Sequence, residues 1–328
     1  MAEEQGYPRQ ERPRLSAEQE QLRKELQGRL KKQRKKKRRL KEALTLAVGV
    51  FLLVCFVREW LKKPEVLPVE GGLAVTFIDV GQGDCTLITA GDSTMLIDCG
   101  EASEAGKVED YLRGCGIDRL DIVVGTHPHS DHMGGMAEIV RDFDVGKVII
   151  PHLDDEDVPV TAFFTDFLDA VGEKKVPLTE AETGDSFQLG DAGCRIIAPN
   201  SRDYADLNNY SVGILMRHGS NSFIFTGDAE GVSEKEMAER GMLSHADVYK
   251  AGHHGSDSSG TEEFLSIVSP DNAVISCGEG NPYGHPDDIT LQRLAEYTDN
   301  IYRTDLCGTI VFISDGDSLS VETERSAA

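Results

Sequence analysis

Residues 126–135 read Thr-His-Pro-His-Ser-Asp-His-Met-Gly-Gly, and this stretch says more about the protein than any other. It holds one carboxylate, Asp131, and three of the chain's nine histidines, His127, His129 and His132. An apolar, strand-like segment precedes it and a Gly-Gly turn ends it. Because alternate side chains leave a strand end in opposite directions, such a loop can aim its ligands at two nearby points. The stretch therefore predicts a metal-binding loop that can contribute ligands to a two-metal hydrolytic site.

Composition indicates a globular body with a strong charge asymmetry. The chain has 328 residues, of which 39% are hydrophobic, enough for a substantial core. Residues 1–42 carry 15 Lys/Arg and 7 Asp/Glu, whereas the remainder carries 19 and 50. A body this acidic repels a polyanion except where metal ions or a local basic patch reverse the field. Composition therefore argues against an extended nucleic-acid groove.

An uncharged apolar run at 43–57 follows a basic cluster at 31–41. As a helix the run spans roughly 22 Å at ~1.5 Å per residue, which is short of the roughly 30 Å hydrocarbon layer of a membrane. Leu40, Trp60 and Leu61 can supply the missing length. The run therefore has the features of a short membrane span.

We accordingly predict a single-pass transmembrane anchor at 43–61, a basic cytoplasmic tail at 1–42 and a linker at 62–72. The positive-inside rule places the acidic body on the extracellular side of the cell membrane. The alternatives are a cleaved signal peptide, lipidation at Cys55 and, for the basic run, a nucleic-acid-binding tail.

Two strand-rich regions, each with helix-like segments, follow the linker. The first opens with short β-type runs between residues 73 and 97, separated by Gly-rich turns typical of an antiparallel meander. The second extends from 186 to 314. Two such halves favour a packed α/β sandwich with outer helices over a single doubly wound sheet. We predict this domain at 73–316, followed by a C-terminal strand end and tail at 317–328.

Further candidate site residues also follow apolar strands. Asp228 ends a strand in a Gly-Asp pair, where a carboxylate can bridge two cations, although Gly-Asp is also a common turn. His253 and His254 lie between glycines, and His285 lies in an Asn-Pro-Tyr-Gly-His-Pro loop. Histidines in Gly-rich loops are seldom core residues. The acids of the Gly-rich turn at 79–84 can orient ligand histidines by hydrogen-bonding to the ring nitrogen that does not bind the metal. The alternative is that this segment is only a hairpin turn.

Together these motifs resemble the metallo-β-lactamase superfamily, whose ligand loop is written HxHxDH. The match is closer to its ComEC-like branch, the hydrolase domain of DNA-uptake competence proteins and its free-standing relatives. The segments that carry the resemblance lie in order within about 73–316, at 77–84, 96–100, 126–135, 208–211, 226–228, 253–256, 283–286 and 308–310. The resemblance implies a four-layered αββα sandwich.

The resemblance also implies two divalent metal ions, zinc or manganese. Their ligands are side chains of the strand-end motifs: His127 and His129 for one ion, Asp131, His132 and His285 for the other, and Asp228 as the bridge. Asn208 or Asn209 stands where the superfamily has a third histidine for the first ion. Because an amide oxygen is a weaker and harder ligand than imidazole, the first site is expected to bind manganese, or zinc loosely.

Asp131, His253 and His254 are the predicted catalytic residues. The resemblance leaves open whether His253 or His254 is a further metal ligand or the acid that protonates the leaving group. Ser256 and Ser259 are predicted to donate hydrogen bonds to a phosphate, although a Ser/Gly stretch is also typical of a flexible loop.

These residues predict a membrane-anchored, extracytoplasmic, metal-dependent hydrolase, most simply a phosphodiesterase or nuclease. A pair of metal ions activates water and neutralises charge on a phosphoryl group. The competence resemblance favours DNA as substrate, whereas the acidic body favours a diester in a teichoic-type wall polymer or a small-molecule ester. Outside enzymes, the alternative is a membrane-tethered binding module with an inactive site.

Overall fold

The computed structural model describes residues 32, 35 and 72–325, and all structural statements below concern these residues. The predicted anchor at 43–61, nearly all of the tail at 1–42 and the linker up to residue 71 lie outside them. Among the residues that are described, no helix combines the length and the hydropathy of a membrane span.

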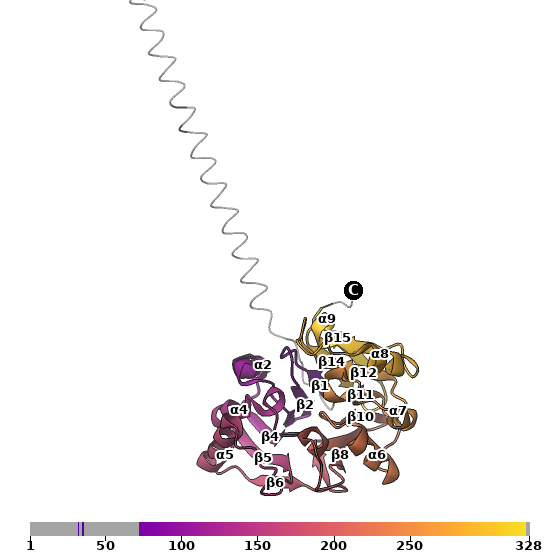
Figure 1. The fold of residues 1–328 in the computed structure, drawn as a ribbon. Helices are drawn as coiled ribbons and strands as arrows, with labels where there is room; N and C mark the ends of the chain where they lie inside the picture. The colour runs from indigo at the N-terminus through magenta and orange to yellow at the C-terminus, as the bar shows by residue number, and fades with distance from the viewer. Residues whose placement is uncertain (1–31, 33–34, 36–71, 326–328) are drawn as a thin grey trace, which may run out of the picture. The chain divides into compact units, whose positions relative to one another are not determined.

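Two mixed β-sheets form the centre of the unit at Pro64–Ala328 (Figure 1). The first sheet has the strand order β15-β14-β1-β2-β3-β4-β5-β6. Its strands are β1 (Leu73–Phe77), β2 (Thr86–Ala90), β3 (Ser93–Ile97), β4 (Arg119–Val124), β5 (Asp144–Pro151), β6 (Leu178–Ala181), β14 (Ile310–Ser314) and β15 (Leu319–Thr323). The expected antiparallel meander is confirmed for β1, β2 and β3. Strand β15 extends the sheet beyond residue 316.

The second sheet has the order β13-β12-β11-β10-β9-β8-β7. Its strands are β7 (Ser186–Leu189), β8 (Ala192–Ala198), β9 (Gly213–His218), β10 (Asn221–Phe225), β11 (Val248–Lys250), β12 (Asn272–Ile275) and β13 (Ile301–Arg303). Strands β10 to β13 are mutually parallel, so their carboxyl ends lie along one edge of the sheet.

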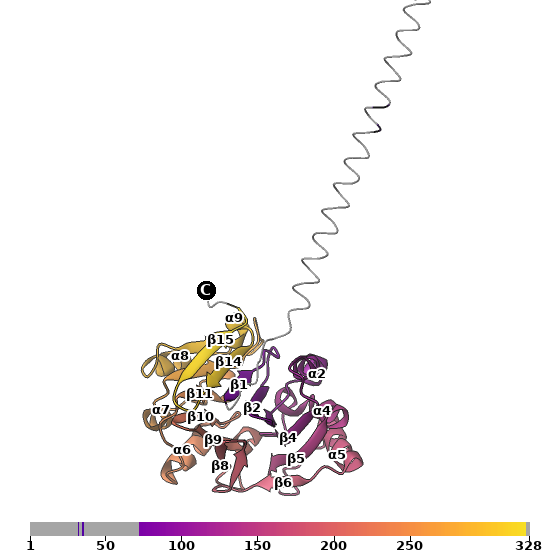
Figure 2. The ribbon, with the colours of Figure 1, turned by 180° about the vertical axis from the view of Figure 1, so that it is seen from behind.

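Helices cover the outer face of each sheet, as the two opposite views show (Figures 1 and 2). The first sheet carries α2 (Ala105–Gly114), α4 (Met136–Asp142) and α5 (Ala162–Lys174), and the second carries α6 (Gly231–Glu239), α7 (Glu262–Val268) and α8 (Asp288–Ala295). Short helical segments are η1 (Ala102–Glu104), α3 (Ser130–Met133), η2 (Leu207–Tyr210), η3 (Gly252–Gly255) and α9 (Thr304–Cys307). The predicted α/β sandwich of two sheets with outer helices is therefore confirmed.

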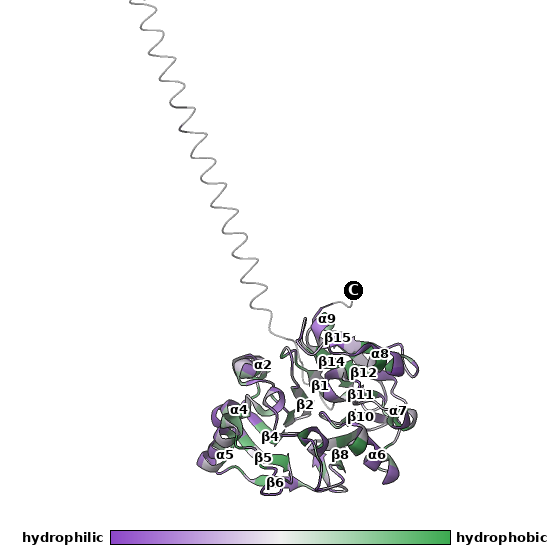
Figure 3. Cartoon of the chain, viewed as in Figure 1, coloured by the Kyte–Doolittle hydropathy of each residue, from purple (hydrophilic) through white to green (hydrophobic). Residues whose placement is uncertain are grey.

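Three apolar layers hold the sandwich together, one between the sheets and one under each set of helices. Buried strands carry the hydrophobic colours in Figure 3, and the outer turns of the helices carry the hydrophilic ones. Phe77 of β1 meets Phe225 of β10 across the sheets, with ring centroids 6.2 Å apart. The ring of Phe312 in β14 packs edge-on against Phe77 at 6.2 Å. These aromatic contacts hold the two halves in a fixed relation.

The contacts of Phe77 predict a large loss of stability in Phe77→Ala. Its side chain is fully buried, so truncation leaves a cavity between the sheets and should lower the free energy of unfolding by about 3–5 kcal/mol. Val160→Ala is the control, because Val160 is 98% exposed. Chemical denaturation monitored by circular dichroism measures both, and equal stability of the two variants would contradict this account of the core.

Candidate metal centre

Polar side chains gather where neighbouring strands end. In the first sheet, Asp98 follows β3 and the loop at 126–135 follows β4, and these two strands are parallel. In the second, Asp228 follows β10 and the pair His253-His254 follows β11. Because the carboxyl ends of parallel strands meet at one edge, the sandwich brings these loops together around a pocket of about 320 Å³.

One donor set surrounds the buried carboxylate of Asp228, which is 2% exposed. His132 Nε2 lies 3.1 Å from Asp228 Oδ2, and His254 Nε2 lies 3.4 Å from the same oxygen. His254 Nε2 is also 3.2 Å from Asp131 Oδ2. Two imidazole nitrogens and two carboxylates thus converge from four positions on one point, as a divalent metal ion requires.

The two rings of this set are oriented by hydrogen bonds to their other nitrogen. His132 Nδ1 lies 2.8 Å from Asp98 Oδ2, and His254 Nδ1 lies 3.0 Å from the carbonyl oxygen of Ser276. Partners of this kind fix the ring and leave Nε2 for a metal ion. Asp228 Oδ1 is buried and has no hydrogen-bond partner among the described residues, and His132 Nε2 has only its ion-pair contact with Asp228 Oδ2. The unpaired carboxylate oxygen fits a bound cation, since buried polar groups are otherwise paired.

Asp84 lies within the same cluster but has a supporting position. Atoms of Asp84, His132, Asp228 and His254 all fall within 4.8 Å of one another. However, the Asp84 oxygens face the Nδ1 side of His254, at 3.4 Å, and form an ion pair with the Lys250 ammonium. A carboxylate on the Nδ1 side orients the ring from behind. The expectation that an acid of the turn at 79–84 supports a ligand histidine therefore fits Asp84.

A second donor set lies on the other side of Asp228. His127 Nε2 is 3.0 Å from His129 Nδ1 and 4.0 Å from Asp228 Oδ2. His253 Nε2 is 3.9 Å from Asp228 Oδ2 and 3.5 Å from the amide nitrogen of Asn208. Asn208 Oδ1 is buried and has no hydrogen-bond partner among the described residues. The set therefore has three imidazoles beside one side-chain amide, and the third imidazole comes from His253, one of the two histidines considered as a further ligand.

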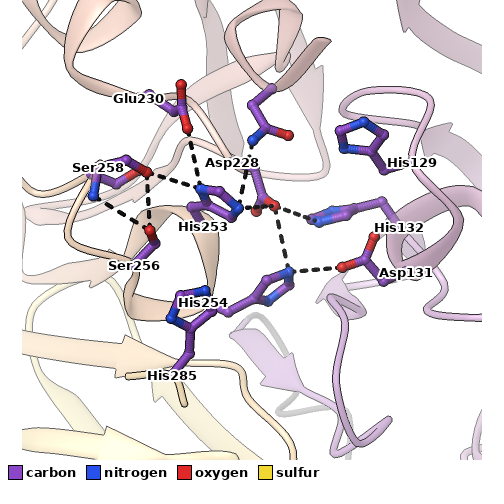
Figure 4. Close-up of polar contacts among 12 residues, drawn as sticks. His129, Asp131, His132, Asp228, Glu230, His253, His254, Ser256, Ser258 and His285 are labelled. Atoms are coloured by element: carbon purple, nitrogen blue, oxygen red, sulfur yellow. Dashed lines mark hydrogen bonds and ion pairs between the residues drawn. The ribbon is translucent and has the colours of Figure 1, made fainter. Parts of the chain in front are cut away.

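Figure 4 shows His132, His253 and His254 directed at Asp228 from different sides. The backbone makes this possible, because His253 (φ 48°) and His254 (φ 53°) are both left-handed. Such non-glycine conformations cost about 1–3 kcal/mol each and cluster at functional sites. Here they direct adjacent side chains to the same carboxylate, with ring centroids 6.2 Å apart.

His285 lies outside both sets, although it was expected to bind the second ion with Asp131 and His132. It lines the pocket, where its ring centroid is 5.8 Å from that of His253 and its Nδ1 is 3.2 Å from Asp287 Oδ2. His285 follows β12, whereas His254 follows β11, the direct neighbour of β10. His254 therefore lies closer to Asp228 than His285 does, and the metal role expected of His285 stays a prediction.

The predicted phosphate donors Ser256 and Ser259 do not line the pocket. Ser259 is fully buried and donates to the carbonyl oxygen of Ala229 at 2.8 Å. Ser256 Oγ lies 3.1 Å from Ser258 Oγ, and that hydroxyl in turn lies 3.0 Å from His253 Nδ1. Both serines therefore support the loop of the two histidines rather than a substrate.

Asn209, the alternative to Asn208, is a structural residue. Its Oδ1 accepts hydrogen bonds from the backbone N–H of Glu230 at 3.1 Å and of Ser233 at 3.4 Å. It therefore orders the chain that follows Asp228. Of the two amides, only Asn208 lines the pocket.

Two glycines allow the loops to approach this closely. A Cβ on Gly83, which has φ +146°, would meet the Asp131 carbonyl oxygen at 2.4 Å. A Cβ on Gly227, with φ +52°, would meet Ser211 Oγ and Thr126 Cβ at 2.9 Å. Both positions therefore favour glycine, and both hold a carboxylate of the site in place.

Burial and neighbouring charges shift the pKa values of the side chains in the pocket. Burial and the neighbouring His132 hold the pKa of His127 well below its usual value, so this ring is neutral. Burial opposes protonation of His254 as well, but the carboxylates of Asp228, Asp131 and Asp84 raise the pKa of His254 to about 10. The pKa of Asp228 is held well below its usual value by the surrounding histidines, although burial acts against this. The site therefore holds ionised carboxylates and protonated imidazoles when no cation is bound.

Sequence reasoning missed the roles of Asp98 and Lys250. Asp98 follows an apolar strand in the quoted segment 96–100, which was a usable signal for a site residue. Lys250 ends β11 and is 2% exposed, and its ammonium has the Asp84 carboxylate as ion-pair partner. A lysine at the end of a short strand normally lies at the surface, so its sequence position did not reveal this role.

Metal content tests whether His254 or His285 belongs to the donor set of Asp131 and His132. His254→Ala should lower the bound metal by about half, because it removes one donor of a two-ion site, whereas His285→Ala should retain it. His245→Ala is a matched control, since that side chain is 53% exposed. Inductively coupled plasma mass spectrometry of the full chain gives the counts. The opposite pattern, with loss in His285→Ala alone, would contradict the assignment.

Metal affinity should increase with pH. Because the pKa of His254 is raised to about 10 and that of His132 is also raised well above its usual value, both rings are protonated near neutral pH. A metal ion must displace these protons, so affinity for Mn²⁺ should rise by up to about tenfold per pH unit for each proton released. Calorimetric titrations between pH 6 and pH 8, in buffers of different ionisation enthalpy, count the protons. A pH-independent affinity would be inconsistent with these protonated rings.

The sequence of the chain is similar to those of known proteins over the range that contains these loops. A family model described as the metallo-beta-lactamase superfamily matches residues 78–279. The chain is 33% identical over 259 residues to ComE operon protein 3 of Bacillus subtilis (strain 168), covering 73% of this chain and 32% of that protein. It is 30% identical over 270 residues to competence protein ComA of Neisseria gonorrhoeae, covering 80% and 35%. The chain thus spans about a third of the length of these curated relatives.

A solved structure supports the fold alone. CmlA, a diiron beta-hydroxylase from Streptomyces venezuelae, matches with a TM-score of 0.50 and 17% identity, over 72% of this chain and 53% of that chain. The range matched by the family model includes the metal-binding loop, Asp228 and both histidines of η3. The chain therefore belongs to the metallo-β-lactamase superfamily, in which its similar relatives include competence-related proteins.

Proposed function

We propose that this chain is a metal-dependent phosphodiesterase, in which the two donor sets around Asp228 would hold divalent ions. One observation carries the proposal: two donor sets meet at a single oxygen, Asp228 Oδ2, with nitrogens 3.1–4.0 Å away. When bound, a pair of divalent ions lowers the pKa of a water and neutralises charge on a phosphoryl group. The donor types suit zinc or manganese, and the amide in the His127 set favours manganese there.

The residues of the chain then supply orientation and proton transfer. Asp98 and the Ser276 carbonyl hold the rings of His132 and His254, so these donors need no rearrangement during the reaction. His285 lines the pocket outside both donor sets. Burial lowers the pKa of His285, so its ring is neutral near pH 7 and can accept a proton from the attacking water. We assign His285 this role.

A small or single-stranded phosphodiester fits this site better than an extended nucleic-acid duplex does. The wall of the pocket is formed by histidines and carboxylates, and the part of the chain after residue 42 carries 19 basic and 50 acidic residues. A small or single-stranded diester needs no long cationic groove. DNA is the proposed macromolecular substrate because competence proteins are among the relatives. A teichoic-type wall polymer or another small ester is the second candidate, favoured by the acidic surface.

We further propose that the hydrolase domain works outside the cell membrane, tethered through residues 43–61. The apolar run preceded by basic residues supports this topology, with the N-terminus in the cytoplasm. A non-enzymatic binding module is disfavoured, because its function would not require two complete donor sets around one buried carboxylate.

Hydrolysis of bis-p-nitrophenyl phosphate, single-stranded DNA and a cyclic dinucleotide, with zinc and manganese added separately, tests the function. We expect metal-dependent turnover that falls by at least about 100-fold in Asp131→Ala and His132→Ala, because each removes a donor. His285→Ala should keep its metal and still lose about 100-fold in kcat. His245→Ala is the control. If the metal content and turnover of the Asp131 and His132 variants matched those of the unmodified chain, the enzymatic proposal would fail.

A further inference from the structure

Tyr283 lines the metal pocket yet exposes 68% of its surface. One face of its ring stacks on His285, with an interplanar angle of 11° and centroids 5.8 Å apart. The metal donor sets do not include it, and the proton transfer assigned to His285 does not need it. A large aromatic side chain held at the rim of a polar pocket therefore has a free face next to the reacting centre.

The loop that carries Tyr283 is ordered by the side chain of Asn281. Its Nδ2 donates to the carbonyl oxygens of Gly278, at 3.0 Å, and His285, at 2.6 Å. Its Oδ1 accepts from the backbone N–H of His285 at 3.0 Å. These bonds close the loop on both sides of the tyrosine. The ring is consequently presented on a pre-ordered platform, which lowers the entropy cost of binding a flat group.

Gln82 gives an independent sign of a ligand in the same pocket. Its Oε1 accepts from the backbone N–H of Gly278 at 3.1 Å, which fixes the orientation of the amide. Its Nε2 is buried and has no hydrogen-bond partner among the described residues. Gln82 and Tyr283 both line the pocket. A buried donor of fixed orientation beside a free aromatic face points to a ligand that has both a flat surface and an acceptor atom.

We propose that Tyr283 and Gln82 form a nucleobase subsite next to the metal centre. The base stacks on the free face of Tyr283, and Gln82 Nε2 donates a hydrogen bond to an acceptor on the base edge. This inference rests on the proposed phosphodiesterase function and narrows its substrate to nucleotide diesters. An alditol-phosphate polymer has no flat group to stack. Bases in a duplex already stack on their neighbours, so the subsite selects single-stranded or short substrates.

Stacking also agrees with the charge of the protein. After residue 42 the chain carries 50 acidic and 19 basic residues, so attraction to a long phosphate backbone is a poor source of affinity. Base–aromatic stacking does not depend on net charge and tolerates any base sequence. A subsite for one base beside the scissile phosphate thus supplies recognition that the surface charge does not.

The test compares a thymidine dinucleotide with the same diester carrying an abasic tetrahydrofuran unit, using the manganese-loaded full chain. The unmodified protein should prefer the base-bearing diester by about tenfold in kcat/KM, within the range expected for stacking of one base. Tyr283→Ala should reduce this preference to about one, mainly through KM, and Tyr283→Phe should keep it. Gln82→Glu retains the oxygen that faces Gly278 but removes the donor, so the preference should fall about fivefold. Val160→Ala, a fully exposed site, serves as the control.

The outcomes separate two failures. Equal cleavage of both diesters by the unmodified protein, or a Tyr283→Phe variant as impaired as Tyr283→Ala, overturns the nucleobase subsite and leaves the phosphodiesterase proposal standing. Failure to cleave either diester overturns the phosphodiesterase proposal and the subsite with it. Because each result is a ratio measured on one preparation, a partly unfolded variant does not imitate the expected effect. Fluorescence anisotropy of a labelled single-stranded oligonucleotide gives a second readout, in which Tyr283→Ala binds about tenfold more weakly and Tyr283→Phe does not.

Discussion

The buried carboxylate of Asp228 is the constraint on which the rest of the structure depends. It is 2% exposed, and four histidines place a ring nitrogen within 4.0 Å of one of its oxygens. Two of these histidines come from the loop after β4 in the first sheet and two from η3 in the second. A site of this kind exists only while the two sheets remain packed, because neither sheet holds a complete donor set. The aromatic contact between Phe77 and Phe225 and the apolar layer around it hold the two sheets together. They are therefore needed for the donor sets as well as for stability.

The side chains behind the donor histidines orient the imidazole rings and balance the buried charges. Asp98 accepts from the backbone N–H and the hydroxyl of Thr126, at 2.8 and 2.7 Å, and lies beside His132. Burial raises the pKa of Asp84, but the Lys250 ammonium and His254 together lower it to about 2. An isolated buried charge is costly, and removing one partner of such a pair typically costs about 3–5 kcal/mol. Lys250 thus allows a second ionised carboxylate to remain close to Asp228, where it orients His254.

The sandwich and the metal-binding loop could be predicted from the sequence because both rest on local patterns. Short alternating strands, Gly-rich turns and the spacing of His127, His129 and His132 are visible without the fold. The approach of His253 and His254 to Asp228 could not be predicted locally: it follows from the order of β10 and β11 and from two left-handed residues that no spacing rule indicates. Lys250 was missed for a similar reason, since only the packed sheets bury it. The membrane anchor at 43–61 stays a prediction from hydropathy and charge.

In the proposed site, Asp228 would join two metal ions whose remaining donors come from different loops. Anomalous diffraction at the manganese edge, from crystals of the manganese-loaded protein, tests it most directly. Two peaks are predicted, both in contact with Asp228: one beside His127, His129 and His253, and the other beside Asp131, His132 and His254. A single peak bound by Asp84, or peaks bound by His285 in place of His254, would contradict the account.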